Sequence, residues 1–174
     1  MDWKWLFFSF EGRIPRKLFW MGMIVMIVFS VLVAFAVSSI MGVNLFALAL
    51  MGDKIDAMSA LSSRMGWVSL VVYLIMCWPA YALCVKRCHD RGTSGIVVVL
   101  SIGLGILNNL LQAFGLNYDV VEIGNVEALT PNAASIALGT VIGLVSLYLL
   151  VVLGFLKGNK GDNKYGPDPL AATD

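Results

Sequence analysis

Four long apolar stretches dominate the pattern of hydrophobic and polar positions along the chain. They cover residues 18 to about 41, 66–85, 95 to about 114 and 134–156, and none of them contains Asp, Glu, Lys, Arg or His. About 20 apolar residues are needed for a helix to cross the roughly 30 Å hydrocarbon core of a bilayer. The pattern therefore predicts an all-α integral membrane protein. We expect a bundle of four transmembrane helices in a single membrane domain over residues 1–174, with residues 157–174 as a tail.

The composition agrees with a membrane location. The 174 residues are 59% hydrophobic and 13% charged, and the mean hydropathy is +0.85. An average soluble domain is about 45–50% apolar and about 25% charged. These values exclude a disordered chain, a collagen-like fibre and a disulfide-rich secreted scaffold. The net charge of +1 gives no bulk attraction to nucleic acid, so no nucleic-acid partner is expected.

The basic residues outside the apolar stretches predict which side of the membrane each segment faces. Ten of the twelve Lys and Arg residues lie in the N-terminal segment, in the loop between 66–85 and 95–114, and in the tail. The other two, Lys54 and Arg64, share the remaining loops with several acids. Because basic segments are retained in the cytoplasm, we expect both chain termini to be cytoplasmic.

The third apolar stretch carries a polar stripe. Ser101, Gly105, Asn108 and Gln112 recur at spacings of four, three and four residues, which places them on one helix face. Amide side chains avoid lipid, so the stripe is expected to face other helices. It either forms hydrogen bonds between helices or lines a path for a solute or water. The absence of any ionisable residue in the stretch disfavours a proton relay and leaves a passive pore open.

Small residues and cysteines give two expectations about packing. Gly139 and Gly143 form a small-xxx-small pattern that lets two helix backbones approach, and we favour a contact within the chain over one with a second copy. Three cysteines share one helix face: Cys77, Cys84 and Cys88. We interpret them as structural thiols, because the two that lie near His89 lack a fourth metal ligand. Neither a metal nor a cofactor is expected.

The loop of residues 115–132 contains three acids and no base. Such a charge run is typical of a solvated loop, and a recognition surface is the alternative interpretation. On the predicted topology this loop lies on the outer side of the membrane.

Three polar motifs lie on the expected cytoplasmic side. The first contains Gly12, Arg13, Arg16 and Trp20, the second Arg87, His89 and Asp90, and the third Asn163 and Tyr165. Arg binds carboxylates and phosphates through two hydrogen bonds, and a nearby Asp can orient it. A structural interpretation also exists, since Arg near span ends follows the orientation rule and Gly, Asn and Pro form turns. It does not explain the density of ionisable residues in the second motif.

An enzymatic interpretation of these motifs is weak. His89 and Asp90 are adjacent and can act as an acid–base dyad. No nucleophile and no metal set accompanies them in the sequence. We therefore expect the protein not to be an enzyme, and no catalytic residue is assigned.

In combination, the motifs resemble a known family. Phe-x-Gly-Arg-x-x-Arg-x-x-Phe-Trp, Arg-x-His-Asp-x-Gly-x-Ser-Gly and Gly-x-Asn-x-Tyr-Gly-Pro-Asp-Pro begin at residues 10, 87 and 161. In this order they are similar to the motifs of domain of unknown function 805, a family of small bacterial inner-membrane proteins. The resemblance implies a multi-pass protein of the cell inner (plasma) membrane and supplies no activity. The chain departs from the family at Cys88, where leucine is usual, and at 96–97, where aromatic residues are frequent.

We hypothesise that the three motifs converge into one polar cluster at the cytoplasmic interface. The cluster would join helix ends and present a site for an anionic lipid headgroup or a partner protein. The protein would then be a membrane scaffold or interaction protein whose partners are membrane lipids, a protein or a second copy. The alternative hypothesis is a small transporter or pore component that uses Ser101, Asn108 and Gln112.

Overall fold

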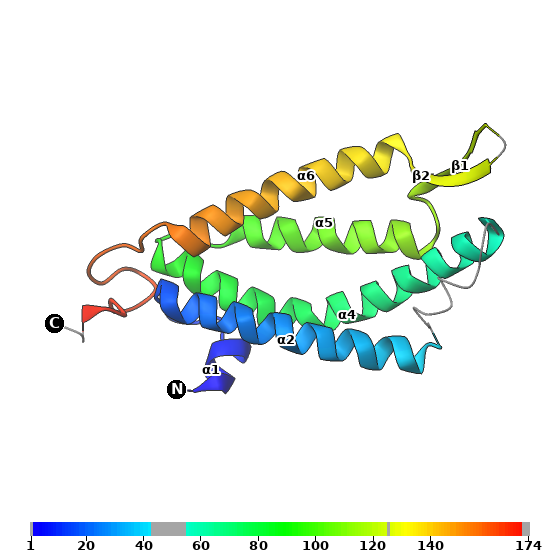
Figure 1. Cartoon of the computed structure of the whole chain (residues 1–174). Helices are drawn as coiled ribbons and strands as arrows, with labels where there is room; N and C mark the ends of the chain where they lie inside the picture. Colours follow the sequence, from blue (N-terminus) through cyan, green and yellow to red (C-terminus); the bar gives the residue numbers. More distant parts are fainter. Residues whose placement is uncertain (1, 43–54, 125, 172–174) are drawn as a thin grey trace. The chain divides into compact units, whose positions relative to one another are not determined.

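The computed structural model describes residues 2–42, 55–124 and 126–171 and is mostly helical (Figure 1). The elements are α1 (Trp3–Phe8), α2 (Arg16–Ile40), α4 (Ile55–Asp90), α5 (Ile96–Ala113), β1 (Tyr118–Ile123), β2 (Val126–Pro131), α6 (Ala133–Leu149) and the π-helix η1 (Leu150–Phe155). Within these ranges, four helical stretches are long and apolar enough to cross a membrane: α2, α4, α5, and α6 continued by η1. The expectation of four long apolar helices is confirmed for this part of the chain.

Helix α4 is much longer than the apolar stretch that predicted it. It has 36 residues and continues through Pro79, whereas the stretch covers only 66–85. It ends in a turn where Gly92 has a φ of +74°, its N–H donates to the His89 carbonyl, and the Thr93 N–H donates to the Cys88 carbonyl. This is the usual glycine-dependent end of a helix. Residues 86–90 of the second motif therefore lie on the last turns of a helix and not in a loop.

Residues 118–123 and 126–131 form an antiparallel pair of strands where the sequence pattern predicted a loop. Strands β1 and β2 pair from Tyr118 opposite Pro131 to Ile123 opposite Val126. The β-branched residues of the segment favour a strand, but a single short hairpin gives a weak sequence signal beside three acids. Two of those acids, Glu122 and Glu127, are direct cross-strand neighbours and both are exposed.

The chain folds into two compact units, through which the long helices run. Unit 1 contains Met1–Ser30, Ile75–Ile102 and Gly143–Asp174, and unit 2 contains Val31–Leu74 and Gly103–Ile142. The core of unit 1 combines residues of α1, α2, α4, α5 and η1: Leu6, Phe7, Ile14, Phe19, Leu83, Cys88, Val98 and Leu153. Cys88 thus packs among apolar side chains, in keeping with its interpretation as a structural thiol.

In unit 2, helices α4 and α5 approach closely at two glycines. A Cβ at Gly66 would lie 2.5 Å from the Ala113 nitrogen, and a Cβ at Gly105 would overlap the Tyr73 hydroxyl. The small core nearby consists of Leu61 and Val68, with Val37, Met65 and Val72 packed against them. At Gly66 the missing side chain lets the backbones of α4 and α5 come this close, and at Gly105 it leaves room for the Tyr73 side chain.

The glycines of α6 do not follow the expected contact. A Cβ added to Gly139 or Gly143 would meet nothing within 4 Å in the described part of the chain. Within the described residues, the expected close contact of this pattern with another span of the same chain is therefore not formed. Large apolar side chains of α2 are also exposed, among them Ile24, Val31, Leu32 and Phe35. Exposed apolar helix faces of this kind are costly in water and normal in contact with lipid.

Candidate functional site

The last turns of the final helix are covered by side-chain donors. Five consecutive carbonyl oxygens each accept one hydrogen bond, at 2.5–3.0 Å: Leu153 and Leu156 from Arg87, Gly154 from Trp20, Phe155 from Arg16, and Lys157 from Arg91. The last four carbonyls of a helix have no partner within the helix and must find one elsewhere. We call this arrangement the carbonyl clamp. It uses Arg16 and Trp20 of the first motif and Arg87 of the second.

The carbonyl clamp also explains why residue 154 is a glycine. A Cβ at Gly154 would lie 2.7 Å from the Trp20 ring, whose Nε1 donates to the Gly154 carbonyl at 3.0 Å. Any larger residue would push the indole away from its acceptor. The backbone here is a π-helix, a local widening that is frequent at functional sites.

A buried carboxylate joins the first two motifs. Asp90 accepts hydrogen bonds from Arg13 at 3.2–3.3 Å and from the Nη1 group of Arg87. The side chains of Arg13 and Arg87 are 1% and 0% exposed. One carboxylate thus balances one of two buried positive charges, and the remaining N–H groups of both guanidinium groups bind backbone carbonyls.

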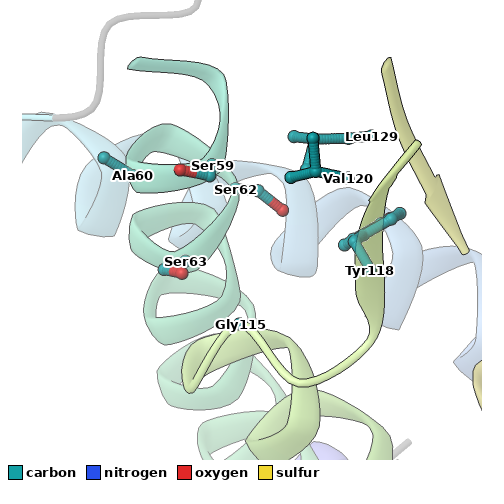
Figure 2. Close-up of a pocket in the computed structure, with 8 residues that line it drawn as sticks. All are labelled: Ser59, Ala60, Ser62, Ser63, Gly115, Tyr118, Val120 and Leu129. Atoms are coloured by element: carbon teal, nitrogen blue, oxygen red, sulfur yellow. The ribbon is translucent and has the colours of Figure 1, made fainter. Parts of the chain in front are cut away.

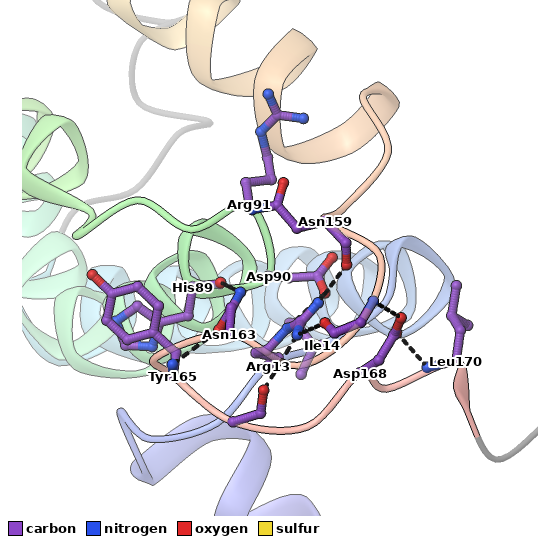
Figure 3. A network of polar contacts seen from close by, with 12 residues as sticks. Arg13, Ile14, His89, Asp90, Arg91, Asn159, Asn163, Tyr165, Asp168 and Leu170 are labelled. Atoms are coloured by element: carbon purple, nitrogen blue, oxygen red, sulfur yellow. Dashed lines mark hydrogen bonds and ion pairs between the residues drawn. The ribbon is translucent and has the colours of Figure 1, made fainter.

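Arg13 also holds the tail. Its Nη groups donate to the carbonyls of Asn159 at 2.6 Å, Gly161 at 2.7 Å and Gly166 at 3.2 Å. Figure 3 shows this guanidinium surrounded by the tail, which loops past the end of α4. The tail passes closely there, because a Cβ at Gly158 would overlap the Asp90 carboxylate.

His89 contacts both other motifs. Its ring stacks on Tyr165, with centroids 3.9 Å apart and planes 7° apart, and its Nδ1 lies 3.3 Å from the Gly12 carbonyl. The His89 carbonyl accepts a hydrogen bond from Asn163 at 3.0 Å, as Figure 3 shows. Gly12 has a φ of +90° and lies against the Trp5 ring, so only glycine fits. The structure thus brings residues of all three motifs into one network within unit 1.

A cavity of about 270 Å³ lies beside this network. Its floor includes the buried Arg87 and Asp90, and its rim carries the exposed cations Arg16, Lys157 and Lys160. Its remaining lining residues are Pro15, Gly158, Asn159, Asp168 and Leu170. Both acids are already engaged, since Asp90 binds two Arg residues and Asp168 accepts the N–H groups of Gly161 and Leu170. The lining contains four cationic side chains and two carboxylates, so its net formal charge is positive.

The predicted site residues divide into two groups by exposure. Arg13 and Arg87 are buried framework residues whose N–H groups bind the protein itself. Arg16 is exposed and uses one Nη group for the Phe155 carbonyl, so part of its guanidinium faces the cavity. This geometry moves the candidate contact residues from the buried arginines to Arg16, Lys157 and Lys160.

The polar stripe of α5 is not part of this network. The Ser101 hydroxyl donates to the Val98 carbonyl of its own helix, and Asn108 and Gln112 are half-buried. These three residues line neither the cavity of unit 1 nor the cavity of unit 2 described next. A role of the stripe in solute passage stays a prediction.

A second cavity, of about 330 Å³, lies in unit 2 between the first turns of α4 and the hairpin (Figure 2). Helix α4 contributes three hydroxyl groups, from Ser59, Ser62 and Ser63. The opposite wall consists of Tyr118 and Val120 of β1, Leu129 of β2, and Gly115 of the segment between α5 and β1. Its described lining carries no charge, so its chemistry differs from that of the cavity in unit 1.

Sequence reasoning missed five contributors to this part of unit 1. Gly154 and Gly158 make room for Trp20 and Asp90, and their requirement appears only once the neighbours are in place. Lys157 and Lys160 were counted as orientation signals, although their position directly after an apolar stretch and beside a motif could have marked them. Lys86, adjacent to a motif residue, is fully buried and was treated in the same way.

Four helices able to cross a membrane define the class of this molecule, a helical multi-pass membrane protein. Within that class, the chain belongs to the family described as protein of unknown function (DUF805), which it matches over residues 7–167. It is 31% identical to the uncharacterized protein YiiR of Escherichia coli strain K12 over 175 residues, covering 95% of this chain and 88% of the relative. The same values apply to YiiR of Escherichia coli O157:H7. No solved structure matches the chain.

Proposed function

We propose that this protein is a non-enzymatic protein of the bacterial inner membrane that binds an anionic phospholipid headgroup at its cytoplasmic end. It crosses the membrane four times as a helical bundle, with both termini in the cytoplasm. The basic residues of the first segment, of the end of α4 and of the tail support this orientation, because basic segments stay on the cytoplasmic side. The cavity of unit 1 then opens toward the inner leaflet and the cytoplasm.

The rim of that cavity carries the proposal. Within residues 2–42, 55–124 and 126–171, the ammonium groups of Lys157 and Lys160 have no hydrogen-bond or ion-pair partner. Arg16 adds a third exposed cation that is only partly used. A phosphate oxygen would supply what these groups lack, since Arg and Lys both bind phosphates strongly.

The size and position of the cavity favour a headgroup. Drug-sized ligands occupy cavities of about 300–1,000 Å³, so about 270 Å³ suits a phosphate with its glycerol portion. Arg16 is the first residue of the apolar helix α2, and Lys157 is the second residue after η1, which ends at Phe155. Cations at the ends of membrane helices lie at headgroup level, where each contributes about 1 kcal/mol of attraction to an anionic leaflet.

The contacts of the polar network favour a structural role over catalysis. His89 stacks on Tyr165, and the carboxylate of Asp90 binds Arg13 and Arg87, so the two adjacent residues serve different partners. Neighbours at i and i+1 on a helix do not face each other. The network holds helix ends and the tail in place, and the cavity beside it binds the ligand.

Lipid retention tests this proposal. The full-length protein is extracted with its native lipids and compared with the Lys157→Gln/Lys160→Gln variant by mass spectrometry of the retained lipids. Loss of two cations is expected to weaken anionic-lipid binding by about tenfold to thirtyfold, from about 1 kcal/mol for each. The Lys17→Gln/Lys164→Gln variant is the matched control, since both residues are exposed and neither lines the cavity.

Two results would contradict the proposal. An equal loss of anionic lipid in both variants would mean that only total charge matters and that the cavity is not a site. Loss of a co-purified protein in the Lys157→Gln/Lys160→Gln variant, with unchanged lipid, would mean that the cavity serves a protein partner instead.

A further inference from the structure

The short helix α1 has both buried and exposed apolar side chains. Leu6 and Phe7 are buried in the core of unit 1, whereas Trp3 is 46% and Phe8 65% exposed. The N-terminus of the helix is capped by Asp2, whose carboxylate accepts the Trp5 N–H at 3.1 Å. A six-residue helix is not stable alone in water, so its conformation depends on what it packs against.

A buried lysine fastens α1 to α4. Lys86 is fully buried, and its Nζ donates to the carbonyls of Trp5 at 2.6 Å, Leu6 at 2.6 Å and Ser9 at 2.8 Å. The same ammonium lies 4.5 Å from the centre of the Trp5 ring. Three carbonyls and an aromatic face offset the desolvation of this charge. Lys86 also satisfies carbonyls that the end of α1 would otherwise leave without a partner.

These contacts fix the depth of α1 along α4. Lys86 follows the apolar stretch 66–85 directly. Beyond the Ser9 carbonyl, the next contact with α4 comes from Phe10, whose ring lies 4.8 Å from that of Trp78 and 5.2 Å from that of Tyr81. At 1.5 Å per residue, Trp78 lies about 12 Å along the helix from Lys86. The chain after α1 therefore runs beside the apolar part of α4, and α1 itself lies level with the end of that part.

Helix α1 thus combines the features of an interfacial anchor. Two large aromatic side chains are exposed at the level where an apolar helix ends, and the exposed Lys4 lies between them in sequence. Aromatic side chains concentrate at the membrane–water interface, where their rings enter the headgroup region. Lys4 is complementary in charge to an anionic leaflet.

We propose that α1 lies in the membrane–water interface at the cytoplasmic face, with Trp3 and Phe8 inserted among phospholipids. Lys86 holds α1 in this position, and we call it the tether. The partner is the phospholipid leaflet itself. This surface is separate from the cavity of Arg16, Lys157 and Lys160, and the inference does not depend on a ligand binding there. It gives the protein a contact with one leaflet in addition to its membrane-crossing helices.

Photo-crosslinking tests this inference in the full-length protein reconstituted into phosphatidylcholine–phosphatidylglycerol nanodiscs. Phe8→p-benzoylphenylalanine places the reactive group on the exposed side of α1, and Lys164→p-benzoylphenylalanine places it on the exposed tail as a control. We expect at least about fivefold more phospholipid adduct at position 8 than at position 164. Equal yields at the two positions would overturn the inference, and so would an adduct to a second protein chain in place of lipid.

A second variant tests the tether. Lys86→Met keeps the length of the stem and removes the three hydrogen bonds, so lipid labelling at position 8 is expected to fall to the level of position 164. Circular dichroism establishes that the long helices are retained. Undiminished labelling in a folded Lys86→Met protein would refute the role of Lys86. If that variant does not fold, the comparison of positions 8 and 164 in the otherwise unchanged chain still decides whether α1 contacts lipid.

Discussion

Replacing Asp90 by Asn is expected to destabilise the protein by about 3–5 kcal/mol, the usual cost of removing one partner from a buried ion pair. Asp90 is 4% exposed and accepts two N–H groups from Arg13 and one from Arg87. The three side chains together carry one net positive charge, and the substitution raises this to two. The Asn amide group would also point N–H donors at N–H donors, leaving at least one guanidinium without its acceptor.

The assay is reversible unfolding of the purified protein in mixed micelles, followed by the loss of helical signal. Glu11→Gln is the matched control, because it makes the same chemical change at an exposed carboxylate that has no hydrogen-bond or ion-pair partner in the described part of the chain, and its effect is expected to stay within about 0.5 kcal/mol. A double-mutant cycle with Arg13→Met should give a coupling of about 0.5–3 kcal/mol, since both substitutions remove the same contact. An Asp90→Asn cost below about 1 kcal/mol would refute the interpretation of Asp90 as the centre of the network.

Two further predictions concern other parts of the molecule. Gly66→Ala should destabilise the chain by about 1–3 kcal/mol, because the added Cβ would lie 2.5 Å from the Ala113 nitrogen and force α4 and α5 apart; an unchanged unfolding midpoint in mixed micelles would contradict this. The pKa of Asp168 lies below its ordinary value because the backbone N–H groups of Leu170 and Gly161 donate to its carboxylate. The turn of the tail around Asp168 should therefore be fully ordered above the ordinary carboxyl pKa of about 3.9, and this order should be lost as the pH falls through the lower pKa of the folded state. The measurement is the protection of the Gly161 amide from hydrogen exchange. Asp168→Asn is the control, because its side chain does not titrate.

The long helices could be predicted from the sequence because a membrane helix depends on a local property. Each apolar stretch is long enough by itself, and no distant residue is needed to recognise it. The ends of α4 were harder to predict. Its polar first and last turns are helical because they pack against the rest of each unit, and hydropathy does not reveal this. The hairpin was missed for a similar reason. Its strands are held by pairing between residues far apart in the segment, such as Tyr118 with Pro131, and the local sequence does not show this pairing.

The motif residues were found in the sequence, and their roles were not. Arg13 and Arg87 were selected for their ability to bind an anion, and the structure directs their N–H groups to Asp90 and to carbonyls of the protein. Apart from the Arg87–Asp90 pair, whose members are three residues apart, the acceptors lie 66 to 153 residues away along the chain, so no local pattern predicts them. Gly154 and Gly158 gave no signal for the same reason: what they leave room for comes from other helices.

The carbonyl clamp has a consequence for how the protein is made. Its donors Arg16, Trp20 and Arg87 are synthesised before its acceptors, which follow them by 66 to 139 residues along the chain. During synthesis these donors therefore have no such acceptor until η1 has been made, and the acceptors find their partners only if the earlier helices are correctly placed. A chain that is truncated, or that has one helix inverted, retains unsatisfied carbonyls and guanidinium groups at the membrane boundary.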